Sequence, residues 1–77
     1  MATVRFFAAA EQMAGVTEET RAETTLGELR AALASERPAL GAILPKCAVL
    51  VGGSRVADET VLDADVLVDV LPPFAGG

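Results

Sequence analysis

Only one segment of this 77-residue chain has the pattern of a long amphipathic helix, and this limits the folds open to the chain. The apolar residues of the segment recur at helical spacing and form a single stripe: Leu26, Leu29, Ala32 and Leu33. Thr25 and Glu28 fit a capping box at its start, and Pro38 limits its far end, which predicts a helix over residues 26–36. One such helix can cover only one face of a small sheet.

The remaining segments are short and have the composition of strands and turns. Strands are predicted over residues 3–7, 17–23, 47–51, 54–56 and 66–71. The charged second strand suits a sheet edge, and Gly52-Gly53 suits a tight turn. Residues 8–14 favour a short helix ended by Gly15, whereas residues 39–45 form an apolar connection with room for one helical turn.

The first and last strands are the most apolar, so we expect them side by side at the centre of the sheet. The predicted order is strand, short helix, strand, long helix, hairpin, strand. This pattern predicts an α+β fold of the β-grasp (ubiquitin-like) type, with a mixed sheet, one main helix on one face and a short extra helix. We expect one domain over residues 1–71 and an extended tail over residues 72–77.

Charge and composition argue against several functions. The net charge is −5 without a basic cluster, which disfavours nucleic acid and suits docking on a basic face of another protein. The chain has no histidine, and its one cysteine, Cys47, allows neither a disulfide framework nor a CxxC motif, so no metal site is expected. The apolar run at residues 6–10 is too short to span a bilayer, and no signal peptide is recognisable, so we expect a cytoplasmic protein without membrane contact.

The most distinctive segment is the tail, whose sequence is Pro-Pro-Phe-Ala-Gly-Gly. Two prolines cannot continue a central strand and favour a polyproline II path, in which six residues reach about 19 Å. Gly76 and Gly77 lack Cβ atoms, so the Gly77 carboxylate can pass through a channel too narrow for side chains. The alternative is a glycine-rich chain end without a function.

A second candidate surface lies on the sheet face that the helix leaves uncovered. Strand alternation places Leu67 and Leu71 there, and Phe7 has the parity to join them, which favours a protein interface. The alternative is burial beneath the 39–45 connection. Phe74 is expected to anchor the tail on a partner, with folding back onto its own domain as the alternative.

Two further groups are interpreted as structural. Cys47 begins an apolar strand and is expected to pack as a small hydrophobe rather than to carry sulfur. The acidic pairs at 18–19 and 58–59 have no evident partner that would shift a pKa, so we expect them to be solvated.

The tail also carries a resemblance to a known family. Residues 69–77 (DVLPPFAGG) resemble the end of the ubiquitin-like sulfur carriers, most closely the small subunit of molybdopterin synthase, the MoaD type. Residues 4–8 (VRFFA) fit the first strand of that family. The capped helix, the Gly52-Gly53 hairpin and residues 63–65 follow in the expected order, so the resemblance covers the whole chain.

The resemblance implies a two-stage chemistry at Gly77. A partner similar to ubiquitin-activating enzymes would adenylate its carboxylate with ATP and magnesium, and a sulfur donor protein would convert the adenylate to a thiocarboxylate (1-thioglycine). The large subunit of molybdopterin synthase would then receive the tail and use the sulfur to build molybdopterin, in a heterotetramer of two carriers on a large-subunit dimer. The chain would be the sulfur-donating subunit of a sulfurtransferase, non-catalytic alone and without a bound cofactor or metal.

The residues assigned by this interpretation fall into two sets. Gly77 and Gly76 are the reactive positions. The partner-binding positions are Phe7, Leu67, Leu71, Pro72, Pro73, Phe74 and Ala75. Three alternatives stay open: sulfur delivery to thiamine thiazole or cysteine synthesis, a ubiquitin-like protein modifier, and a β-grasp interaction module with an inert tail.

Overall fold

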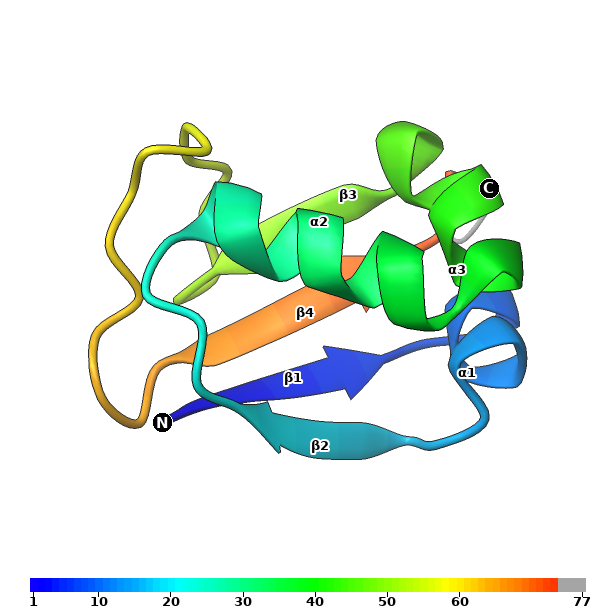
Figure 1. Cartoon of the computed structure of the whole chain (residues 1–77), viewed down its shortest axis with the longest axis horizontal. Helices are drawn as coiled ribbons and strands as arrows, with labels where there is room; N and C mark the ends of the chain where they lie inside the picture. The colour runs from blue at the N-terminus through cyan, green and yellow to red at the C-terminus, as the bar shows by residue number, and fades with distance from the viewer. Residues whose placement is uncertain (74–77) are drawn as a thin grey trace.

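A computed structural model describes residues 1–73 as one layer of sheet covered by helices on one face (Figure 1). The elements in chain order are β1 (Ala2–Phe6), α1 (Ala9–Ala14), β2 (Glu18–Arg21), α2 (Leu26–Glu36), α3 (Pro38–Ile43), the 3₁₀ turn η1 (Leu44–Lys46), β3 (Ala48–Val51) and β4 (Leu67–Leu71). In Figure 1, α2 lies across the sheet, and α1 and α3 gather at the end toward which β1 and β4 both point. Within residues 1–73, no helix is long and apolar enough to cross a membrane.

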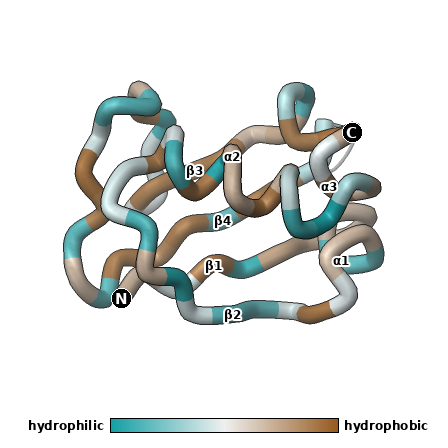
Figure 2. The backbone as a smooth tube through the Cα atoms, in the orientation of Figure 1, coloured by the Kyte–Doolittle hydropathy of each residue, from teal (hydrophilic) through white to brown (hydrophobic). Residues whose placement is uncertain are grey.

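The sheet has four strands in the order β2-β1-β4-β3. The central pair, β1 and β4, is parallel, and the two outer pairs are antiparallel. The prediction that the first and last strands lie side by side at the centre is therefore confirmed. Figure 2 shows the expected contrast in hydropathy, since β2 at the edge is mostly hydrophilic whereas β1 and β4 carry apolar positions.

The core fills the space between α2 and the central strands. In register, Val4 lies opposite Val68 and Phe6 opposite Val70, and all four side chains are buried. The stripe of α2 faces them with Leu26, Leu29 and Leu33, each at most 2 % exposed. Burying an aliphatic side chain of this size contributes about 1.5–3 kcal/mol, so this contact holds the helix on the sheet.

The start of α2 is fixed by its capping box. The Glu28 amide donates to Thr25 Oγ1 at 3.2 Å, and the Thr25 amide donates to Glu28 Oε1 at 3.3 Å. Gly27 allows a close approach beyond the cap, because its amide donates to the Asp58 carbonyl at 2.9 Å and a Cβ would lie only 3.1 Å from Asp58 Cβ. The helix predicted over residues 26–36 is confirmed.

The interpretation of residues 39–45 as a connection is wrong, because they belong to α3 and η1. Pro38 lies in the first turn of α3, where its missing N–H costs nothing. A Cβ on Gly41 would lie 3.0 Å from Ala34, so glycine lets α3 pack closely on α2. Leu40 and Leu44 are buried as a result.

The returning strand predicted over residues 54–56 is also wrong. Gly52 and Gly53 do form a tight turn with positive φ, but only one bridge, Val51 to Ser54, follows it. The loop instead crosses to the start of α2, where the Leu26 amide donates to the Thr60 carbonyl and the Leu62 amide donates to the Thr24 carbonyl. These contacts fix residues 60–62 of the loop against the start of α2.

A cluster of ion pairs joins the edge strand β2 to the end of α2. Arg21 binds three carboxylates, those of Glu19, Glu23 and Glu36, and Arg37 binds Glu19. The expectation that Glu19 is a simply solvated acid is therefore wrong: hydrogen bonds from Arg37 and Arg21 lower the pKa of its carboxyl. Arg21 is only two residues from Glu19, but Arg37 is 18 positions away, and the cluster is complete only when β2 packs near the end of α2.

We predict that this cluster makes the fold acid-sensitive. Because the pKa of Glu19 is lower in the folded state, its contribution is present above the unfolded value of about 4.3 and is lost as the pH falls through the folded value. Glu19→Gln should lower the free energy of unfolding by about 1 kcal/mol at pH 7 and flatten its dependence on pH below about 4.3.

Urea unfolding at pH 7 and in acid measures both effects. Glu59→Gln is the control, because Glu59 is exposed and forms no ion pair with any residue in the 1–73 range. Equal acid sensitivity in the wild type and Glu19→Gln would contradict the prediction.

Candidate functional site

The first part of the candidate site is the sheet face that carries no helix, which we call the open face. Strand alternation puts Leu67, Asp69 and Leu71 of β4 on this face, because Val68 and Val70 point into the core. Leu67 is 42 % exposed and Phe7 is 38 % exposed, whereas Leu71 is half-buried. The alternative of burial beneath residues 39–45 is excluded for Phe7 and Leu67, since both are exposed.

An ion pair in the middle of the open face was missed by sequence reasoning. Arg5 donates to both oxygens of Asp69, from Nε at 2.7 Å and from Nη2 at 3.0 Å. The Arg5 guanidinium also lies over the Phe7 ring, with 5.7 Å from its carbon to the ring centroid, which places Phe7 on the same face. The sequence did contain a signal for this ion pair, since the two central strands carry opposite charges at outward positions. Which charges pair depends on the register of β1 against β4, which the sequence does not give.

The second part of the candidate site is the chain that leaves β4. Leu71 lies opposite Ala48 at the end of the sheet, Pro72 is buried and Pro73 is exposed. The other predicted tail positions, Phe74, Ala75, Gly76 and Gly77, lie outside the described residues. The roles assigned to the tail stay predictions.

Cys47 lies between η1 and β3 and packs against the core, as expected for a small hydrophobe. Burial raises the pKa of its thiol, and the charge of Arg30 opposes this only in part. A thiol that is harder to ionise is a weaker nucleophile at neutral pH. The environment of Cys47 therefore favours a structural role.

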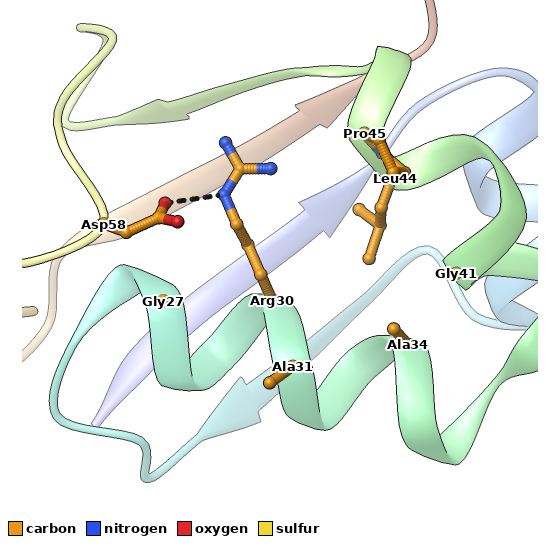
Figure 3. Close-up of a pocket in the computed structure, with 8 residues that line it drawn as sticks. All are labelled: Gly27, Arg30, Ala31, Ala34, Gly41, Leu44, Pro45 and Asp58. Atoms are coloured by element: carbon orange, nitrogen blue, oxygen red, sulfur yellow. Dashed lines mark hydrogen bonds and ion pairs between the residues drawn. The ribbon is translucent and has the colours of Figure 1, made fainter.

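A groove lies on the helical side of the domain (Figure 3). It encloses about 530 Å³ and is lined by Gly27, Arg30, Ala31, Ala34, Gly41, Leu44, Pro45 and Asp58. Arg30 extends from α2 toward the loop and donates from Nε to Asp58 Oδ1 at 3.0 Å. Among the described positions predicted to bind a partner, Phe7, Leu67, Leu71, Pro72 and Pro73, none lines this groove.

The exposed apolar face beside the start of the tail is that of a small docking domain. Residues 1–73 contain no cluster of acidic, cysteine or histidine side chains able to hold a metal ion. What they do present is an apolar face with a central ion pair, on the strand that leads into the tail.

Comparison with known proteins agrees with this class. The chain belongs to the ThiS family, the small ubiquitin-like sulfur carriers, whose family model matches residues 4–77. No curated protein matches its sequence significantly.

Solved structures are similar over almost the whole chain and confirm the β-grasp fold. Small archaeal modifier protein 1 (SAMP1) from Methanosarcina acetivorans is 21 % identical, with a TM-score of 0.85 over 99 % of this chain and 95 % of that one. SAMP1 from Haloferax volcanii is 23 % identical, with a TM-score of 0.76 over 99 % and 98 %. A chain in the complex of subunits 1 and 2 of molybdopterin-converting factor from Helicobacter pylori is 27 % identical, with a TM-score of 0.73 over 99 % and 97 %.

We predict that the apolar side chains of the open face contribute little to folding. Leu67→Ala should change the free energy of unfolding by less than about 1 kcal/mol, because Leu67 is 42 % exposed and lies outside the core. The matched substitution Leu33→Ala, in the buried stripe of α2, should cost about 2–5 kcal/mol. Urea denaturation of the two variants measures the difference, and a similar loss in both would show that Leu67 belongs to the core.

Proposed function

We propose that the chain carries sulfur on the carboxylate of Gly77 and delivers it to a pterin precursor in molybdopterin synthesis. The observation that supports this most directly is the family match, which runs through the Pro-Pro-Phe-Ala-Gly-Gly segment to Gly77. The folded domain is then the part that partners recognise, and the slender tail is the part that they modify. In this proposal, Gly77 and Gly76 are the positions at which the chemistry takes place.

The proposed chemistry makes a poor acyl donor reactive in two stages, adenylation and then sulfur transfer. An oxygen of the Gly77 carboxylate attacks the α-phosphorus of ATP and pyrophosphate leaves, so that AMP becomes a good leaving group. A persulfide sulfur then attacks the carbonyl carbon and AMP departs. A second thiol reduces the acyl disulfide, which leaves a thiocarboxylate on Gly77 and a new disulfide between the thiols.

ATP, magnesium and the general bases belong to the partners in this proposal. The enzyme that forms the adenylate is of the ubiquitin-activating type, and the sulfur comes from a donor protein. A covalently held sulfur reaches the acceptor at a fixed position, which gives a proximity advantage over free sulfide. The chain alone is non-catalytic, and its proposed location is the cytoplasm.

The open face supplies the docking surface in this proposal. Exposed apolar side chains on a domain this small favour contact with another protein, and Leu67 and Phe7 offer them beside β4. A partner that covers this face also lies next to the point where residues 72–77 begin. Docking and insertion of the tail then occur on one surface.

The molybdopterin branch is favoured by the Helicobacter pylori complex, in which subunits 1 and 2 of molybdopterin-converting factor are joined. By analogy, the large subunit would receive this tail, with two carriers on a large-subunit dimer. The likeness to the two SAMP1 structures favours a second candidate, a protein modifier joined through Gly77 to lysines. Sulfur delivery to thiamine thiazole or cysteine synthesis would use the same carrier chemistry.

We predict that sulfur is loaded on the tail and not on Cys47. Incubation with ATP, magnesium, the adenylating enzyme of the same organism and a persulfide donor should raise the mass of the C-terminal peptide by the exchange of one oxygen for one sulfur. Cys47→Ala should be loaded equally, because burial raises the pKa of the Cys47 thiol. Tandem mass spectrometry locates the added sulfur; a gain on the Cys47 peptide would overturn the proposal, and abundant high-mass conjugates in cells would favour the modifier.

We predict that loading requires Gly77 to be the last residue. Appending one alanine after Gly77 should abolish the mass gain, because the reactive carboxylate is then displaced and carries a side chain into the partner's channel. Gly77→Ala should impair loading more than folding for the same steric reason. Thermal unfolding serves as the control, and normal loading of the extended chain without trimming would contradict the mechanism.

A further inference from the structure

A row of charged side chains crosses the centre of the open face. In register, Arg5 lies opposite Glu18 of β2 on one side and opposite Asp69 of β4 on the other. Asp69 in turn lies opposite Leu50 of β3. Exposed Leu67 lies to one side of this row along β4, and Phe7 lies to the other side along the first strand.

The ion pair in this row is only partly satisfied within the domain. Nε and Nη2 of Arg5 bind the two Asp69 oxygens, but Nη1 has no hydrogen-bond acceptor among residues 1–73. The Arg5 side chain is 40 % exposed and that of Asp69 only 16 %, so a docked protein would contact the guanidinium rather than the carboxylate. The Nη1 donors would then lose water and need a replacement.

The charges of the row indicate what that replacement is. Arg5 provides one positive group, while Asp69 and Glu18 provide two negative ones, so the row is net negative. A second carboxylate brought to Nη1 would be repelled by both acids. A neutral oxygen, from a backbone carbonyl or a side-chain amide, satisfies the N–H donors without that repulsion.

We infer that the Arg5–Asp69 pair determines which partner surface the open face accepts. That partner surface is apolar and carries one neutral oxygen acceptor, which lies against Arg5 Nη1. A uniformly apolar surface is disfavoured, because it would bury the Nη1 donors without a partner. This inference rests on the proposed function, and it assigns this surface to the adenylating enzyme, since every form of that function requires this partner.

The test is a double variant, Arg5→Leu with Asp69→Ala, which replaces the ion pair on the open face by two apolar side chains. If the partner presents an oxygen to Arg5, the double variant should bind the purified adenylating enzyme of the same organism at least about tenfold more weakly, because that oxygen loses its donor. If docking is purely apolar, the double variant should bind as well as the wild type or better, which would overturn the inference.

The chain offers a matched control in its other Arg–Asp pair. Arg30→Leu with Asp58→Ala removes a singly bonded Arg–Asp pair on the helical side by the same two substitutions, and it should leave the dissociation constant unchanged. Equal weakening in both double variants would overturn the specificity claim. Thermal unfolding verifies that each variant is folded.

Arg5→Lys provides a second readout should the double variant fail to fold. Lysine keeps the positive charge opposite Asp69 but lacks the guanidinium fork and its Nη1 donors, so binding should also weaken. Wild-type affinity for Arg5→Lys would overturn the inference. Absence of binding and of ATP–pyrophosphate exchange with the wild type would instead overturn the proposed function, and the inference with it.

Discussion

The parallel pairing of β1 with β4 is the constraint on which the rest of the molecule depends. It brings together two segments from opposite ends of the chain, so that Arg5 and Asp69, 64 positions apart, share two hydrogen bonds. A parallel pair cannot be closed by a tight turn, so the chain between the two strands needs a crossover connection in addition to β2 and β3. That crossover supplies α2, whose leucines cover one face, and leaves the other face open.

Local signals in the sequence were sufficient for the elements that local chemistry determines. The capping box and the leucine stripe predict α2 with its observed bounds, and the alternation of β4 predicts which residues reach the open face. The pairing of the first and last strands at the centre of the sheet was also predicted correctly, because the two most apolar segments belong there. These features need no knowledge of the neighbouring elements.

What escaped prediction depends on contacts between distant segments. Helix α3 carries no capping signal, and its packing relies on the close approach of Gly41 to Ala34, which no pattern within residues 38–43 reveals. The loop after Gly53 continues to the start of α2, where it is held by the Asp58 and Thr60 carbonyls and the Leu62 amide, and these distant contacts leave no local pattern. The Arg5–Asp69 pair likewise needs the strand register. For the candidate site, the sequence predicted the apolar part of the open face but not the ion pair at its centre, and the tail assignments stay predictions.

The central position of β4 has a mechanical consequence, because β4 leads directly into residues 72–77. A force applied to that segment acts along the strand axis, whereas the ladders to β1 and β3 run across it. Such a force loads both ladders in shear, so that many bonds must rupture together, while a strand at the sheet edge could be peeled away bond by bond. Under the proposed function, in which a partner takes up the tail, this topology would let the domain resist the traction.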